Sequence, residues 1–208
     1  METDRRMSKF QFPEAIKSRP VWGTLEPRAG KSHLMIADAE GAEALLDLAR
    51  ADASLMSTAE IIYIPRDTGE TYVDQLSKLD PRHLYVGPSY EAAVPRLRRM
   101  LSDAHMGLQV YLAGTEGLMG QVMREATDAG IPHTAIQTEH RGSVARRMQC
   151  VHCKGITEDV ITDPFVCSHC GLNLFVRDHY SRRLAAYQGV CIDAEDPGNV
   201  PEPVRLYS

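Results

Sequence analysis

The chain has 208 residues, of which 43% are hydrophobic and 25% are charged, and this globular composition excludes a wholly disordered protein. Its length is typical of one or two domains. The net charge of −5 at pH 7 argues against a general nucleic-acid binder, because such proteins use a basic surface to neutralise phosphates.

Residues 1–32 are predicted to form an extended N-terminal arm, because they contain Pro13, Pro20 and Pro27. The first twelve residues lack the apolar stretch of a secretory signal, and no run of eighteen apolar residues occurs in the chain. We therefore expect a cytoplasmic protein that does not enter a membrane and whose thiols stay reduced. The arm could wrap a partner or the chain's own surface, and the second is the simpler expectation.

Residues 33–140 alternate between short apolar runs and helical patterns. The apolar runs predict strands at 33–37, 61–64, 83–86, 108–113 and 134–137, and the patterns between them predict helices at 41–51, 72–79, 90–104 and 118–129. Pro95 is compatible with the third helix if it falls near the first turn. Gly130 stands where a helix C-cap glycine belongs. The alternation predicts an α/β fold with a five-stranded parallel, doubly wound sheet of flavodoxin or Rossmann type.

Residues 145–180 carry two C-x-x-C pairs, Cys150 with Cys153 and Cys167 with Cys170, separated by thirteen residues. The two-residue spacer lets both sulfurs of a pair face one ion, and two pairs complete a tetrahedral shell of four thiolates. This spacing predicts a small zinc-ribbon or rubredoxin-like β module that depends on its metal for stability. It favours a structural zinc ion, with an electron-carrying iron as the alternative, and disulfides are a poor fit to a reducing compartment.

The surroundings of the pairs complete this prediction. Gly155 and Gly171 follow the pairs, where tight turns favour glycine, and residues 156–166 are predicted to form a β-hairpin. The shell is already complete with four sulfurs, so we expect His152 and His169 to be bystanders. Cys191 stands outside both pairs and is expected to behave as a small apolar residue.

Charge divides the chain into three parts. Residues 1–140 carry a net charge of −5, residues 141–183 carry +3, and residues 184–208 carry −3. Residues 181–208 are predicted to form a helix and an irregular acidic tail. The basic part contains Arg141, Arg146, Arg147, Arg177, Arg182 and Arg183. These arginines either form a solvated face that pairs with the tail (Asp193, Glu195, Asp196) or dock an acidic electron partner.

Two segments of the α/β region resemble the pyridine-nucleotide domain of ferredoxin–NADP reductases. They are residues 34–41 (LMIADAEG), at its first strand and glycine-rich turn, and 110–119 (VYLAGTEGLM) with 136–139 (IQTE), at its end. The family turn reads Gly-Gly-x-Gly, but here Asp38 and Ala39 replace the first two glycines and only Gly41 remains. A carboxylate at this turn would oppose the pyrophosphate of a dinucleotide. The resemblance therefore implies that the fold is kept and that dinucleotide binding is lost.

The second of these segments also lacks the residues that the family has beside the nicotinamide. The family places a cysteine near the nicotinamide and a proline two residues later, and this chain has Ala113, Gly114 and Thr115 there. No cofactor-binding residue is therefore predicted in this domain. Thr115 and Glu116 are better explained as the cap and the dipole partner of the following helix.

The whole chain resembles the small subunit of bacterial dimethylamine monooxygenase. The resemblance rests on the order of its parts and on residues 22–27 (WGTLEP), 179–184 (HYSRRL) and 189–197 (GVCIDAEDP). It implies an accessory subunit of a complex that demethylates dimethylamine to methylamine and formaldehyde with NADPH and O2. In that family the haem is on an oxygenase subunit, and the flavin and iron–sulfur cluster are on a reductase subunit.

No complete catalytic constellation is apparent in the sequence, and His105, His133 and His140 are expected to be loop or strand-end residues. Three hypotheses follow. The chain is a non-catalytic accessory subunit with structural zinc, a rubredoxin-like electron carrier with iron, or a zinc-ribbon adaptor unrelated to redox chemistry.

Overall fold

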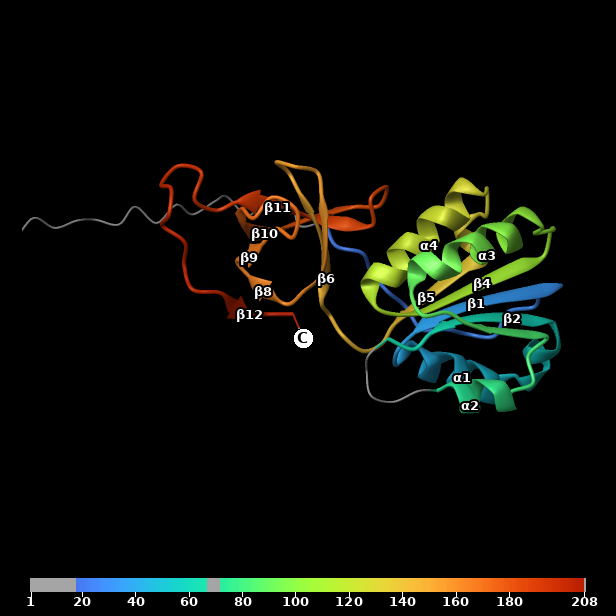
Figure 1. Cartoon of the computed structure of the whole chain (residues 1–208). Helices are drawn as coiled ribbons and strands as arrows, with labels where there is room; N and C mark the ends of the chain where they lie inside the picture. The colour runs from blue at the N-terminus through green and yellow to red at the C-terminus, as the bar shows by residue number, and fades with distance from the viewer. Residues whose placement is uncertain (1–17, 67–71, 208) are drawn as a thin grey trace, which may run out of the picture.

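The computed structural model describes residues 18–66 and 72–207, which form an α/β domain and an adjoining β-rich metal module (Figure 1). Pro13 of the predicted arm lies outside the described residues. Among the described residues, no helix combines the length and the apolar character that crossing a bilayer requires.

The α/β domain contains the predicted five-stranded parallel sheet. Its strands are β1 (Ser32–Asp38), β2 (Ala59–Ile64), β3 (His83–Val86), β4 (Leu108–Gly114) and β5 (Ile136–His140). Their order in the sheet is β3-β2-β1-β4-β5. Strands β2 and β3 lie on one side of β1, and β4 and β5 lie on the other, so the topological switch point is between β1 and β4. The last strand begins two residues later than predicted, because a 3-10 turn, His133–Ala135, precedes it.

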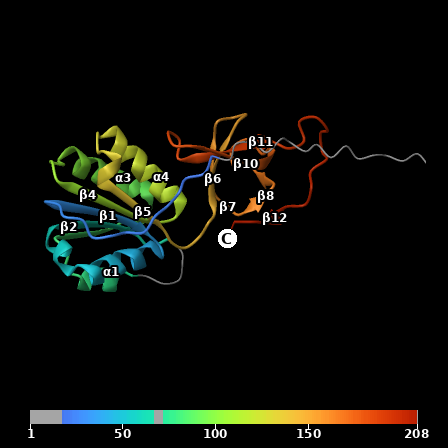
Figure 2. The same cartoon turned by 180° about the vertical axis from the view of Figure 1, so that it is seen from behind.

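Two layers of helices cover this sheet. Helices α1 (Gly41–Ala51) and α2 (Val73–Lys78) lie on one face, and α3 (Tyr90–Ser102) and α4 (Glu116–Asp128) lie on the other (Figures 1 and 2). Successive strand residues point to opposite faces, so Met35 joins the core under α1 while Ile36 joins the core under α3 and α4. Burial of both faces explains why the strands read as uninterrupted apolar runs.

The helix ends follow the sequence signals closely. Gly130 has a φ of +84° and caps α4 in a Schellman arrangement, since the Ile131 amide donates to the Ala126 carbonyl oxygen at 2.9 Å. Pro95 departs from the prediction, because it lies in the second turn of α3 rather than the first. It is exposed there, so water can reach the carbonyl of Glu91 that loses its helical partner.

The metal module is a second five-stranded sheet with the order β7-β6-β11-β10-β9. The strands are β6 (Arg146–Cys150), β7 (Ile156–Val160), β9 (Phe165–Val166), β10 (Asn173–Ser181) and β11 (Ala186–Cys191). The predicted hairpin within 156–166 is wrong, because β7 pairs with β6 and β9 pairs with β10.

The C-terminal segment also differs from the prediction. The predicted helix in 181–208 is wrong, because residues 182–185 form a turn and β11 follows it, paired with both β6 and β10. Ala185 has a φ of +51°, a conformation that no helix continues through. The tail ends in β12 (Val204–Arg205), which pairs with β8 (Thr162–Asp163).

The described part of the arm wraps the chain's own surface, as expected. The Ser18 amide donates to the Asp178 carbonyl oxygen of β10 at 3.1 Å, and the Gly23 amide donates to the Thr138 carbonyl oxygen of β5 at 2.9 Å. Leu25 then donates its amide to the carboxylate of Glu139 at 2.7 Å. The arm therefore runs from the module to the edge of the parallel sheet and contacts both bodies (Figure 2).

Candidate functional site

The four paired cysteines converge at one end of the module, and their Sγ atoms all lie within 4.8 Å of one another. Cys150 and Cys170 are 3.9 Å apart at sulfur, and Cys153 and Cys167 are 3.7 Å apart. Metal–sulfur bonds of 2.3 Å in a tetrahedron place the sulfurs roughly 3.8 Å apart. The four residues therefore fit one tetrahedral metal ion, and both zinc and iron match this donor set.

The two cysteine pairs have the same backbone geometry. The amides of Lys154 and Gly171 each donate to the carbonyl oxygen of the first cysteine of their pair, at 3.0 Å. Both residues are in the left-handed region, with φ of +64° and +74°. The prediction is thus correct for Gly171. Gly155 is instead required by close packing, because a β-carbon there would lie 2.5 Å from the ring of His169.

The protein favours the thiolate form at Cys167 of the second pair, whereas at Cys170 an amide hydrogen bond from Leu172 is outweighed by burial and the neighbouring sulfurs, which raise the pKa of that thiol. Burial would raise the pKa of Cys167, but amide donation from Cys170 and His169 outweighs burial and lowers that pKa to about 6. Thiolates are the form that binds metal. Cys150 and Cys167 are buried in the module core, whereas Cys153 and Cys170 are exposed, so the shell has an inner and an outer side.

The other candidate histidines and Cys191 make contacts outside the four-sulfur shell. His169 faces away from the sulfurs, and its Nε2 lies 2.8 Å from the carbonyl oxygen of Ile156. Cys191 packs against the module core, and burial is the main cause that raises the pKa of its thiol. His105 and His133 are exposed, and His140 Nε2 lies 3.1 Å from the Ser143 carbonyl oxygen.

A second constellation lies at the carboxyl edge of the parallel sheet, where the strand order reverses. Asp38, at the end of β1, is 2% exposed and accepts the Thr115 amide at 2.7 Å and the Thr115 hydroxyl at 2.6 Å. Thr115 is in turn the N-cap of α4, whose Oγ1 accepts the Leu118 amide at 3.3 Å. The carboxylate therefore sits on the positive end of α4, the place at which an anionic ligand would otherwise bind.

The remaining residues of the degenerate turn support this arrangement. Ala39 has a φ of +44°, and a β-carbon at Gly41 would lie 2.4 Å from the Ala113 carbonyl oxygen, so α1 approaches β4 closely. Gly114 has a φ of +121°, and a β-carbon there would overlap the Asp38 carboxylate. Gly41 and Gly114 thus allow the close packing around this turn, and Asp38 places an internal anion in it.

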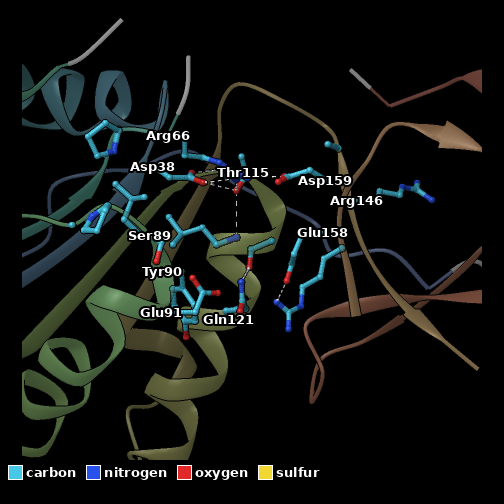
Figure 3. A pocket seen from close by; sticks show the side chains of 18 of the residues that line it. Asp38, Arg66, Ser89, Tyr90, Glu91, Thr115, Gln121, Arg146, Glu158 and Asp159 are labelled. Carbon is cyan, nitrogen blue, oxygen red and sulfur yellow. Dashed lines mark hydrogen bonds and ion pairs between the residues drawn. The ribbon is translucent and has the colours of Figure 1, made fainter. Parts of the chain in front are cut away.

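Arg66 connects Asp38 to the metal module. Its guanidinium lies 3.0 Å from Asp38 and 2.6 Å from Asp159 of β7 (Figure 3). Burial raises the pKa of Asp38, although the hydrogen bonds from Thr115 and Arg66 act in the opposite direction. These residues line a cleft of about 760 Å³ between the α/β domain and the module.

Helix α4 is the element of the α/β domain that contacts both the arm and the β10–β11 hairpin of the module, and we call this contact region the joint. No pattern in the sequence indicated it. Glu116, in its first turn, accepts hydrogen bonds at 3.2 Å from Trp22 of the arm and from Tyr187 of β11. Four residues later, a β-carbon at Gly120 would lie 2.1 Å from the Tyr180 hydroxyl and 3.0 Å from Ala185. The tip of the β10–β11 hairpin is therefore seated directly on the helix.

The predicted pairing of the basic residues with the acidic tail is wrong. Arg141 pairs with Glu139 at 2.7 Å, and Arg147 pairs with Glu158 of the neighbouring strand. Arg146 is buried, lies 2.7 Å from Asp178, and stacks between the rings of Tyr187 and Tyr207 at 4.4 and 4.1 Å. Close pairing with acids of the two bodies compensates the buried charge better than exposed tail acids would.

Comparison with protein families gives two matches in chain order. Residues 14–136 match the family described as dimethylamine monooxygenase subunit DmmA-like, N-terminal domain, and residues 147–190 match the corresponding C-terminal domain. The chain is also similar to the heme-dependent oxidative N-demethylase delta subunit of Ectopseudomonas mendocina (strain ymp). The two are 34% identical over 131 residues, which make up 62% of this chain and 75% of that protein.

Two solved structures share part of the architecture. Phthalate dioxygenase reductase is 17% identical, with a TM-score of 0.46 over 68% of this chain and 47% of its own. The flavohem-like FAD/NAD-binding domain of nitric oxide dioxygenase from Vibrio cholerae O1 biovar El Tor is 14% identical, with a TM-score of 0.42 over 60% of this chain and 56% of its own. The chain thus spans about half the length of each.

Proposed function

Because the chain belongs to the dimethylamine monooxygenase subunit DmmA-like family, we propose that it is an accessory subunit of a haem-dependent oxidative N-demethylase. Its partners in this proposal are an oxygenase subunit that carries the haem and a reductase subunit that carries flavin and an iron–sulfur cluster. The complex demethylates dimethylamine with NADPH and O2. The similarity to an N-demethylase delta subunit supports this assignment.

The observation that carries a non-catalytic role is the position of Asp38. Its carboxylate is held against the N-terminus of α4 by two hydrogen bonds from Thr115 and an ion pair with Arg66. A dinucleotide phosphate would meet this negative charge at the strand ends where such folds bind nucleotides. We therefore assign NADPH oxidation to another subunit, and this domain retains the reductase-like architecture for assembly.

The four-cysteine site is proposed to hold a structural zinc ion, bound by Cys150, Cys153, Cys167 and Cys170. Four thiolates leave no open coordination position for a substrate, and zinc has no redox chemistry in proteins. The module core beside the shell is small and includes Cys150 and Cys167 themselves. Metal binding therefore supplies part of the folding free energy of the module.

A second candidate function is supported by the outer side of the shell. Cys153 and Cys170 are exposed. An iron ion in the same four thiolates could pass single electrons to a docked partner through these sulfurs, as in rubredoxin-like proteins. In this alternative the chain relays electrons between the reductase and the haem subunit.

Two measurements on the purified full chain test the proposal. Calorimetric titration with NADPH is expected to give no binding heat, and micromolar affinity would contradict the role assigned to Asp38. Metal analysis is expected to give zinc in a colourless protein. Iron accompanied by strong visible absorption would favour the electron-relay alternative. Co-purification with a haem protein from the native source tests membership of the complex, and a chain that always elutes alone would contradict it.

A further inference from the structure

A groove of about 420 Å³ lies where the arm, helix α4 and the β10–β11 hairpin meet. The hairpin tip points at α4 in both views of the molecule (Figures 1 and 2). The walls come from three separate parts of the chain, including Val21 of the arm, Met123 of α4 and Tyr180 of β10. The groove therefore exists only when the three parts are held together.

The floor of the groove exposes apolar surface. Val21 is 92% exposed although it is flanked by Pro20 and by Trp22, which is packed partly against the α/β core. The same arm residues, Pro20 and Trp22, line a second hollow of about 650 Å³ that also contains Val144 and Leu206, both about half exposed. The two hollows thus adjoin the arm at the same residues, Pro20 and Trp22, and each offers exposed apolar side chains there.

The rim of the groove is basic. Arg124, Arg182 and Arg183 line it together with one carboxylate, Asp128, and within the described part of the chain Arg124 is the one of the three that is paired, with Glu125 at 3.3 Å. Arg182 and Arg183 are exposed at the hairpin tip, and neither forms an ion pair with any described residue. The whole chain carries a net charge of −5, so this concentration of positive charge is a local departure from an acidic surface.

We propose that this groove binds an acidic amphipathic segment of another subunit of the N-demethylase complex. The inference rests on the proposed function, since it needs a subunit to bind. Apolar side chains of the segment would cover Val21 and Trp22, and its carboxylates would pair with Arg182 and Arg183. Tryptophan, tyrosine, methionine and arginine, which line the groove, are the residues enriched in protein–protein interfaces.

The test uses the full chain co-expressed with the oxygenase and reductase subunits from the same source. The double variant Arg182→Glu/Arg183→Glu reverses the charge of the rim without touching the core. The matched control is Arg96→Glu/Arg99→Glu, because these arginines are also exposed but lie on α3 at the opposite, amino-terminal edge of the sheet. The readouts are complex formation by size-exclusion chromatography with light scattering, and hydrogen exchange of this chain alone and in the complex.

We expect the rim variant to bind the complex at least about 100-fold more weakly, because two glutamates would face the carboxylates of the segment and replace attraction with like-charge repulsion. The control should bind as the wild type does. Hydrogen exchange of the wild type should slow around residues 19–23, 120–128 and 180–185. A rim variant that assembles normally would overturn the inference and leave the proposed function intact. Protection at the groove caused only by self-association of the chain would overturn the inference alone, and wild-type chain that assembles with no subunit would overturn both.

Discussion

Gly120 offers the most direct test of how the metal module is attached to the α/β domain. A β-carbon at this position would lie 2.1 Å from the Tyr180 hydroxyl and 3.0 Å from the β-carbon of Ala185. A β-carbon essentially never comes within 3.0 Å of another atom, so in Gly120→Ala the Tyr180 side chain must move and Ala185 must give by a few tenths of an ångström, which loosens the contact of the hairpin tip with α4. Tyr180 packs against the module core and its ring lies 5.0 Å from that of Tyr187, so its hydroxyl cannot move without disturbing this packing.

The size of the effect follows from comparison with a second glycine of the same helix. A β-carbon at Gly117 would lie 3.9 Å from the nearest atom, which is an ordinary contact with Arg147. Both alanine variants gain helix propensity of up to about 1 kcal/mol. Only Gly120→Ala overpacks its surroundings, which typically costs about 1–3 kcal/mol. The Gly120 variant should therefore be less stable than the Gly117 variant by about this amount.

The assay is urea unfolding followed by tryptophan fluorescence. The chain contains a single tryptophan, and Trp22 donates to Glu116 at the joint, so its emission reports on this contact. We expect the transition of Gly120→Ala to shift to lower urea and that of Gly117→Ala to be unchanged or shifted to higher urea. Equal midpoints for the two variants would refute the seating of the hairpin on α4.

Three further predictions concern the metal, the ion pair of Arg98 with Glu125 and a buried arginine. Cys153→Ser should lose bound metal and unfold the module, measured by metal analysis and circular dichroism, whereas Cys191→Ser should keep full metal occupancy. Hydrogen bonds from Arg98 hold the pKa of Glu125 below its usual value of 4.5. The ion pair therefore stabilises the fold fully above about pH 4.5, and this stabilisation is lost as the pH falls through the lowered pKa. Glu125→Gln should therefore be less stable than the wild type at pH 7, and the two unfolding free energies should converge in acid; a difference independent of pH would contradict the argument. Arg146→Ala should lower the unfolding free energy by about 1–3 kcal/mol, because it removes the hydrogen-bonded ion pair with Asp178 and the stacking between Tyr187 and Tyr207 while Arg19 still pairs with Asp178; a loss well below 1 kcal/mol would show that the stacked arginine contributes little.

The α/β domain was predictable because its signals are local. Each strand is buried on both faces and therefore reads as an apolar run, and capping residues such as Ser89, Thr115 and Gly130 mark the helix ends. The metal shell was predictable for a similar reason, since the two-residue spacer within each cysteine pair encodes its geometry. These features need no information from distant parts of the chain.

The module and the joint depend on contacts between distant residues, and the sequence did not reveal them. Strand β7 pairs with β6 rather than with its neighbour β8, whose partner is β12 at the far end of the chain. Glu116 meets Trp22 and Tyr187 across separations of 94 and 71 residues. The carboxylate of Asp38 predicts a turn unsuited to phosphate, but only the fold shows that Thr115 and Arg66 hold this carboxylate in place.

Metal analysis of the chain isolated from its native complex tests the central claim most directly, because the account assigns the chain a structural role in the complex. We predict one zinc ion for each chain, no iron in the four-cysteine site and no visible absorption from the separated chain. Iron in stoichiometric amount, with the absorption of a ferric four-thiolate site, would contradict the structural role and make the chain an electron carrier.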